Sequence, residues 1–200
     1  MNAEPMRTPA AVKQALRLEM IALRARLHQD VRAEKSRAIA DRLEAVEPFR
    51  DARVVALYAP LGTEVDALEV ARRALARGVS VVFPRAVPGE RRLAFARCLP
   101  GELVRGPLGA GEPPRTATEV GLEDVGCVVV PGVAFSRNGL RLGRGGGYYD
   151  ATLAAMPGAA RVGVAYEAQV LPSLPREPHD ALLDALVTEA HTLLFARDSR

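Results

Sequence analysis

The sequence predicts an α/β fold: a mostly parallel, doubly wound sheet with helices on both faces and a small antiparallel excursion. Short continuous apolar runs of strand length recur along the chain, and Cys127-Val-Val-Val130 is the clearest of them. Between these runs, apolar residues repeat at helical spacing. Strands that are apolar on both faces are typical of parallel sheets covered by helices. Because 200 residues suit one domain, we expect a single domain over residues 1–200.

Two helices are expected before the first strand. Thr8 and Pro9 match an N-cap followed by proline at the first helical position, and apolar residues then repeat at helical spacing. The second helix is expected from Asp30, as its cap, to Pro48, which cannot continue a helix. Beyond this point the apolar residues form shorter runs, which indicates the start of the sheet.

Strands and further helices are expected to alternate through the rest of the chain. The expected strands are Val54–Tyr58, Val79–Phe83, Cys127–Val130 and Arg161–Tyr166. One helix is expected from Val65 to Arg77, one to begin near Tyr148, and one to follow Asp180. Residues 84–126 are rich in Pro and Gly, and we expect there an irregular excursion with a short strand at 93–97 and a small antiparallel hairpin.

Composition favours a globular protein that binds neither nucleic acid nor a membrane. The chain is 48% hydrophobic and 26% charged with a net charge of +3, which suits a packed core rather than disorder. Its basic residues are nearly all arginine and Trp is absent, which is weak support for nucleic-acid binding. Cys98 and Cys127 lack zinc or disulfide spacing, so two buried thiols are expected. Without an apolar leader or membrane span, a cytoplasmic location is expected.

The strongest motif is a glycine-rich loop between a predicted strand and a predicted helix. It contains Gly139, Gly143, Gly145, Gly146 and Gly147, with Arg141 and Arg144 among them. Glycines let the backbone turn its N–H groups toward an anion, a helix N-terminus adds partial positive charge, and arginines supply fork-shaped donors. The pattern favours a phosphate site over a surface loop without a ligand. Gly-Lys-Ser/Thr is absent and Tyr148 breaks the dinucleotide fingerprint, so neither of those mechanisms follows.

Four charged residues outside this loop each have two interpretations. Asp150 could hold a Mg²⁺ that also touches phosphates, or could favour the dipole of the helix that begins beside it. Asp180 could take the same metal role or be a simple N-cap. Lys13 and Arg17 lie one helical turn apart, on a face that is either solvated or turned toward a phosphate.

The segment from Arg141 to Asp150, preceded by Pro131-Gly-Val-Ala-Phe135, resembles the signature of the 5-formyltetrahydrofolate cyclo-ligase family. Three other segments resemble the family pattern in the same order along the chain. They are Lys13 to Arg17, Tyr58 to Asp66 and Gln169 to Asp180. The resemblance thus covers nearly the whole chain. Ser136, where the family often has Asp, and Ala59, which is smaller than usual, depart from the pattern.

The resemblance implies an ATP- and Mg²⁺-dependent closure of 5-formyltetrahydrofolate to 5,10-methenyltetrahydrofolate, with release of ADP and phosphate. The residues implied to contact ATP are Lys13, Gln14, Ala15, Leu16, Arg17, Arg141, Leu142, Gly143, Arg144, Gly145, Gly146, Gly147, Tyr148 and Tyr149. Those implied to contact the folate are Ala59, Glu64 and Tyr149, and those implied to hold Mg²⁺ are Asp150 and Asp180. Arg144, Arg141 and Lys13 are the implied catalytic residues, which would neutralise the γ-phosphate.

This chemistry needs no protein nucleophile. Phosphorylation makes the formyl oxygen a leaving group, and the neighbouring N10 amine then attacks, so positioning and charge neutralisation carry the reaction. We expect no covalent enzyme intermediate, small molecules as the only partners, and a monomer. Three alternatives stay open: a noncatalytic nucleotide- or phosphate-binding module, a nucleic-acid binder, and an enzyme of the same scaffold with another substrate.

Overall fold

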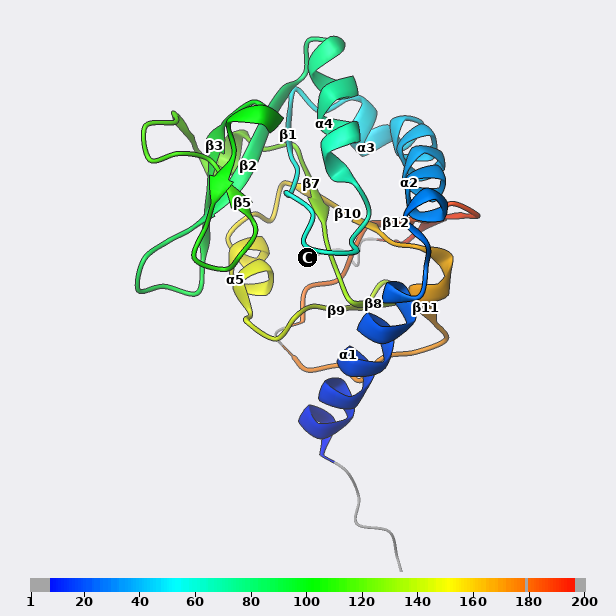
Figure 1. Ribbon diagram of the computed structural model, residues 1–200. Helices are drawn as coiled ribbons and strands as arrows, with labels where there is room; N and C mark the ends of the chain where they lie inside the picture. The colour runs from blue at the N-terminus through cyan, green and yellow to red at the C-terminus, as the bar shows by residue number, and fades with distance from the viewer. Residues whose placement is uncertain (1–7, 179, 197–200) are drawn as a thin grey trace, which may run out of the picture.

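A central eight-stranded mixed sheet has the strand order β13-β12-β10-β7-β1-β2-β3-β6 (Figure 1). The computed structural model describes residues 8–178 and 180–196. The strands of this sheet are β1 (Val54–Ala56), β2 (Ser80–Ala86), β3 (Leu93–Arg97), β6 (Glu119–Val120), β7 (Cys127–Val130), β10 (Ala160–Val164), β12 (Ala185–Val187) and β13 (Thr192–Leu194). The run from β12 to β2 is parallel, whereas β13, β3 and β6 pair antiparallel with their neighbours. The predicted α/β class with a mostly parallel sheet is confirmed.

Helices cover both faces of this sheet, as predicted. Those that cover it are α2 (Gln29–Glu44), α3 (Glu47–Arg50), α4 (Ala67–Ala76) and α5 (Tyr148–Ala154), whereas α1 (Pro9–Ala25) packs elsewhere. Figure 1 shows α2, α3 and α4 grouped on one side of the strands and α5 on the other. The two sides have separate cores, one built around Phe49 and Tyr166 and the other around Phe135 and Leu153. Apolar burial on both faces is therefore what fixes the sheet between the helices.

Helix α1 packs outside the main sheet, against a second, small sheet with the order β11-β8-β9. Its strands are β8 (Ala134–Ser136), β9 (Arg141–Leu142) and β11 (Val170–Leu171). Met20 of α1 shares a small core with Val133, Leu140 and Leu142, and Figure 1 shows α1 beside this sheet. The sequence analysis did not predict these short strands. Their position brings α1 next to the glycine-rich loop that follows β9.

The N-termini of α1 and α4 are fixed by side-chain caps. Thr8 Oγ1 accepts a hydrogen bond from the Ala11 N–H at 3.3 Å, and Pro9 is the first helical residue, as predicted. Asp66 Oδ1 accepts from the Leu68 N–H at 2.9 Å. Helix α4 therefore begins at Ala67, two residues later than the predicted start at Val65, because Asp66 satisfies an N–H that the first turn leaves unpaired.

Two expectations about α2 were wrong. The helix begins at Gln29 after His28, so Asp30 lies inside the first turn, where its charge still suits the helix dipole. It ends at Glu44, and Pro48 lies in the first turn of α3 instead of closing α2. Proline is tolerated there because the first N–H groups of a helix have no partner within the helix.

The helix expected after Asp180 was also wrong, because the chain continues there into β12. Residues Ala185–Val187 are buried on both faces and pair in parallel with β10. A short apolar run that is buried on both faces has no periodicity that separates strand from helix. Strand β13 then closes that edge of the sheet by antiparallel pairing.

The excursion expected within residues 84–126 is confirmed in outline. The predicted strand at 93–97 is β3, and a two-stranded antiparallel hairpin is formed by β4 (Val104–Arg105) and β5 (Gly111–Glu112). Short 3-10 turns occur at Pro100–Glu102, Leu122–Asp124 and Glu167–Gln169. Cys98 and Cys127 are buried free thiols, as predicted. Among the residues that the structure describes, no helix is both long and apolar enough to cross a bilayer.

Candidate active site

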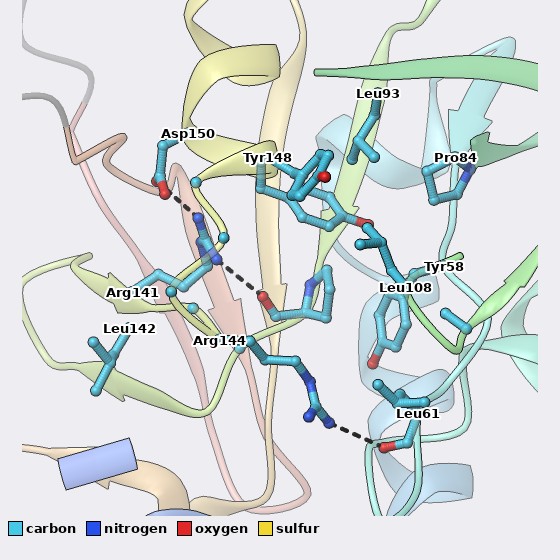
Figure 2. A pocket seen from close by; sticks show the side chains of 18 of the residues that line it. Tyr58, Leu61, Pro84, Leu93, Leu108, Arg141, Leu142, Arg144, Tyr148 and Asp150 are labelled. Carbon is cyan, nitrogen blue, oxygen red and sulfur yellow. Dashed lines mark hydrogen bonds and ion pairs between the residues drawn. The ribbon is translucent and has the colours of Figure 1, made fainter. Parts of the chain in front are cut away.

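A cavity of about 410 Å³ lies at the carboxyl ends of the parallel strands β1 and β7. Its wall is built from α1, the segments after β1 and β7, the loop between β9 and α5, the β4–β5 hairpin, and the segment that precedes β12. Figure 2 shows this cavity from close by. Ligands of open parallel sheets bind at this edge, because the loops that leave the strands converge there.

Most residues implied by the family resemblance meet in this one cavity. The lining residues among them are Lys13, Arg17, Ala59, Glu64, Arg141, Leu142, Gly143, Arg144, Gly145, Gly146, Gly147, Tyr148, Tyr149, Asp150 and Asp180. Gln14, Ala15 and Leu16 do not line it, because they lie on other faces of α1. Leu16 packs instead into the small core beneath that helix.

The glycine-rich loop reaches its shape through backbone conformations that favour glycine. Gly145 and Gly147 have φ values of +99° and +73°, in the left-handed region. A Cβ on Gly145 would also lie 3.4 Å from Cζ of Arg17. Arg17 closes the loop against α1, since its Nε donates to the Gly143 carbonyl at 2.9 Å. The loop is therefore held beside two cationic side chains of α1, Arg17 and Lys13.

Arg141 is fixed at the base of the loop. Its Nη2 donates to Asp150 Oδ1 at 2.7 Å, and its Nη1 donates to the Pro131 carbonyl at 3.4 Å, as the dashed lines in Figure 2 show. The guanidinium carbon also lies 5.7 Å from the ring centroid of Tyr149. Within the described part of the chain, Arg141 Nε is buried and has no hydrogen-bond partner. This side chain thus presents a rigid positive charge beside the cavity.

Lys13 is enclosed by two carboxylates from the segment before β12. Its Nζ lies 2.6 Å from Glu177 Oε2 and 2.8 Å from Asp180 Oδ2. Burial by itself lowers the pKa of Lys13, but the hydrogen bonds to Asp180 and Glu177 outweigh it, so the pKa is raised. Asp180 Oδ2 also accepts from the Glu177 N–H at 2.7 Å. In this structure Lys13 and Asp180 therefore bind each other.

Glu64 lies on the opposite side of the cavity and binds the glycine-rich loop. Its Oε1 accepts from Nε and Nη2 of Arg144 at 3.1 and 2.9 Å, and its Oε2 accepts from the Leu61 N–H at 2.9 Å. Arg144 Nη2 also donates to the Leu61 carbonyl at 3.3 Å, which Figure 2 shows. The carboxylate side chain is 7% exposed and the arginine 45% exposed. The buried carboxylate of Glu64 is thus paired with the solvent-accessible guanidinium of Arg144.

The remaining wall is apolar and aromatic. Figure 2 shows Tyr58, Pro84, Leu93, Leu108 and Tyr148 around it. Burial, and next the negative charge of Glu64, raise the pKa values of the Tyr58 and Tyr149 phenols, so both remain protonated. Such a surface suits a flat ring system with a few polar edges.

Ala59 and Ser136, the two departures from the family pattern, have different positions. Ala59 lines the cavity where the hairpin comes close, since a Cβ on Gly111 would lie 3.0 Å from the Ala59 Cβ. A larger side chain than Ala59 would therefore push the hairpin away. Ser136 is buried outside the cavity wall, and its Oγ accepts from the Leu140 N–H at 3.1 Å. It stabilises the turn that leads into the glycine-rich loop.

Several lining residues were missed by the sequence analysis. They are Tyr58, Leu61, Pro84, Leu93, Leu108, Ala110, Gly111, Glu112, Pro131, Gly132 and Glu177. Glu112 is buried, and burial raises the pKa of its carboxyl. Signals were available for Pro84 and Pro131, because each follows an apolar run of strand length. The hairpin residues carry no motif, and only the fold brings them to the cavity.

The donor set suits a magnesium ion that takes most of its ligands from a nucleotide and water. Across residues 8–178 and 180–196, no group of three or more His, Cys, Asp or Glu side chains could hold a metal ion. Asp150, Glu177 and Asp180 nevertheless line the cavity with carboxylate oxygens. Mg²⁺ needs only one or two carboxylates when phosphates complete its shell.

The fold and the site define an α/β enzyme in which one cavity joins a cationic glycine-rich loop to an aromatic pocket. Residues 9–189 match the model of the 5-formyltetrahydrofolate cyclo-ligase family. The chain belongs to this family, whose members are ATP-dependent ligases of folate one-carbon metabolism. The enzyme class that the sequence implied is confirmed.

Similar proteins support the assignment along nearly the full length. The 5-formyltetrahydrofolate cyclo-ligase of Mycolicibacterium smegmatis is 30% identical over 195 residues, which cover 92% of this chain and 97% of that protein. The NMR structure of Aquifex aeolicus 5,10-methenyltetrahydrofolate synthetase superposes with a TM-score of 0.81 at 34% identity, covering 94% of this chain and 95% of that one. A Mycoplasma pneumoniae synthetase, at 23% identity and a TM-score of 0.72, shares the fold; the match covers 88% of this chain and 98% of that one.

Proposed function

We propose that this chain catalyses the ATP-dependent conversion of 5-formyltetrahydrofolate to 5,10-methenyltetrahydrofolate, with release of ADP and phosphate. The observation that carries the proposal is the placement of the glycine-rich loop arginines and Glu64 around one cavity of about 410 Å³. A phosphate donor at the loop and a folate at Glu64 would therefore have their reacting groups side by side. We take residues 1–200 to act as one catalytic domain.

The reaction balances as two bond exchanges. The γ-phosphoryl group passes from ATP to the formyl oxygen, so the bond to ADP breaks and an iminium phosphate forms whose carbon stays bonded to N5. N10 then attacks the formyl carbon and loses its proton, and the phosphate departs with the former formyl oxygen. Both exchanges depend on holding the reactants in line and on neutralising charge, which this cavity supplies without a protein nucleophile.

The cationic side chains at the loop suit the nucleotide phosphates. Arg141 is immobilised by Asp150, whereas Arg144 is half exposed and can turn from Glu64 to a more strongly charged ligand. Lys13 and Arg17 face the same cavity from α1. Arginine forks match phosphate oxygens in pairs, and lysine adds a compact charge. Arg144, Arg141 and Lys13 are thus the candidates for stabilising the transferred phosphoryl group.

Mg²⁺ bound with the nucleotide would supply positive charge to the phosphates and orient them. Asp150 and Asp180 are the residues that we propose hold it. Asp150 keeps its place through Arg141, and Asp180 through Lys13, so each carboxylate is already fixed at the cavity wall. These pairs also balance the negative charge that the two acids bring to a phosphate site.

The folate would lie against the aromatic wall with its pterin at Glu64. A pterin presents N–H donors along one edge, which a carboxylate accepts in pairs. Tyr149, from the first turn of α5, and Ala59, after β1, border the same space. Because Ala59 is small, the hairpin can close over a ring bound there. Leu108 and Pro84 add apolar contacts on that side.

The test is the near-ultraviolet absorbance of the methenyl product, followed with 5-formyltetrahydrofolate, ATP and Mg²⁺ present and each omitted in turn. We expect a rise that requires all three. Tight binding of both ligands without a rise would favour a noncatalytic binding module, and turnover of a different phosphate acceptor would favour another substrate on the same scaffold. The monomeric state and the cytoplasmic location stay predictions.

A further inference from the structure

Arg24 is a buried arginine near the C-terminal end of α1 that the proposed mechanism does not use. Its Nε donates to Thr63 Oγ1 at 3.0 Å, and its Nη1 donates to the Gly132 carbonyl at 3.3 Å. Its Nη2 lies 4.0 Å from Glu64 Oε1, and the side chain is 2% exposed. Arg24 thus joins α1 to the segments after β1 and β7 and points at Glu64 from behind the cavity wall.

Glu64 therefore faces two cations of different kinds. Arg144 lies at 2.9 Å but is exposed and belongs to the loop proposed to bind nucleotide. Arg24 lies farther away but is buried and held by Thr63 and Gly132. Burial lowers the pKa of Arg24, the charge of Glu64 raises it, and the charge of Arg144 lowers it. The two arginines thus share one carboxylate.

Transfer of Arg144 to a phosphate would leave Glu64 with one cation. The other titratable groups that face Glu64 are Tyr58 and Tyr149, on which its charge acts, and Tyr166, whose Oη donates to the Glu64 carbonyl at 3.3 Å. None of these phenols can supply a positive charge. A buried carboxylate that loses its last cation is costly, because no other positive charge compensates it.

We propose that Arg24 is a positioning residue that keeps Glu64 paired and directed at the folate while Arg144 serves the nucleotide. The inference rests on the proposed function, because it assigns the pterin to Glu64. A carboxylate held by a buried partner keeps its direction when its exposed partner leaves. Arg24 therefore makes it possible for both ligands to be bound at once.

The experiment measures the affinity for 5-formyltetrahydrofolate by calorimetry, with a nonhydrolysable ATP analogue and Mg²⁺ at saturation. Arg24→Met removes the charge at similar volume, and Arg24→Lys keeps the charge but not the fork. Arg26→Met is the matched control, because Arg26 follows the same helix and is exposed. Each variant is also made together with Glu64→Gln, which gives a double-mutant cycle.

We expect Arg24→Met to weaken folate binding about tenfold near neutral pH, since it leaves a buried carboxylate unpaired. Affinity for the ATP analogue should stay within about twofold, and in the Glu64→Gln background Arg24→Met should cost less than about twofold. Arg24→Lys, which keeps the positive charge, should recover most of the folate affinity that Arg24→Met loses, and Arg26→Met should change nothing.

An equal loss from Arg24→Met in both backgrounds would assign Arg24 a purely structural role and overturn the inference. If Arg24→Met does not fold, Arg24→Lys decides, since an equal change of folate affinity from Arg24→Lys with and without Glu64→Gln would equally overturn it. A wild-type protein that fails to bind the folate would overturn the proposed function and this inference with it. Normal wild-type binding with additive variants would overturn only the role of Arg24.

Discussion

The charged residues of the cavity bind one another in pairs, two of which join segments distant in the sequence. Lys13 binds Asp180, Arg141 binds Asp150, and Arg144 binds Glu64. A sequence motif identifies such residues one at a time and assigns each to a ligand. The structure shows in addition which charge each ligand must compete with. The expected effect of a substitution therefore includes what happens to the partner that is left behind.

Arg144→Ala should lower turnover by about 100-fold or more if Arg144 stabilises the transferred phosphoryl group, as loss of comparable electrostatic donors does. Folate binding should change far less, because Glu64 keeps Arg24 beside it. The measurement is kcat and KM for both substrates. Arg137→Ala is a suitable control, since Arg137 is also exposed and pairs with Glu167 away from the cavity. Unchanged turnover would remove Arg144 from the mechanism.

Asp150→Asn should raise the Mg²⁺ concentration that half-maximal activity requires, because a carboxylate ligand is lost. The variant should also loosen Arg141, whose Nη2 donates to Asp150 Oδ1, so the KM for ATP should rise with it. A Mg²⁺ titration at fixed ATP checks this. Asp124→Asn serves as the control, because Asp124 is also an acidic residue but lies in a separate short 3-10 turn. An unaltered titration would leave Asp150 as a residue of the helix N-terminus only.

At the scale of elements, the glycine-rich loop is shaped by backbone angles and by its neighbour α1. The loop follows β9 of the small sheet, and Arg17 fastens it at the Gly143 carbonyl. Its position therefore depends on the packing of α1 against that sheet through Met20. Sequence reasoning identified the loop and the helix separately. Their contact depends on a small sheet in which β11 pairs with β8 from a distant part of the chain.

Gly145→Ala tests this element. At a φ of +99° an alanine is strained, and its Cβ would lie in contact with the Arg17 side chain, 3.4 Å from its Cζ. We expect ATP affinity to fall several-fold and the free energy of unfolding to fall by about 1 kcal/mol, of the order of a strained backbone position. Gly158→Ala is the matched control, because Gly158 has open space and no positive φ. Equal behaviour of the two variants in calorimetry would contradict the assignment.

At the scale of the whole molecule, the fold places a nucleotide loop and a folate wall on either side of one cavity. Glu64 follows β1, and Arg144 belongs to the loop after β9. Their ion pair spans the cavity from one binding region to the other. A ligand that binds either Glu64 or Arg144 breaks this ion pair and leaves the other side chain available for the second ligand. The two binding events are therefore expected to be coupled.

Coupling predicts that a nonhydrolysable ATP analogue tightens the binding of 5-formyltetrahydrofolate, and that the folate tightens nucleotide binding by the same factor. We expect a several-fold effect at low salt, measured by calorimetry with each ligand alone and with the other at saturation. The Arg144→Ala variant should show no such effect, since it has no ion pair to break. Identical affinities with and without the second ligand would show that the pair does not oppose binding.

Local patterns in the sequence were sufficient for much of this protein. Continuous apolar runs predicted β7 in full and the parallel class of the sheet, and Thr8 with Pro9 predicted the start of α1. The glycine-rich loop predicted both a helix beginning at Tyr148 and a phosphate-type site. These features depend on residues close together in the chain, so their physical causes can be recognised without the fold.

Only the tertiary structure decided the rest. The strand β12, read as a helix, is a strand because β10 lies beside it, and the short strands β8, β9 and β11 exist only through pairing. The cavity wall at Leu108 and Glu112, the partners of Lys13, and the approach of Arg24 to Glu64 all join residues far apart in sequence. Composition and periodicity reflect the interactions that each segment makes within itself. Pairing, burial and counter-charges arise between segments, and the fold alone brings these segments together.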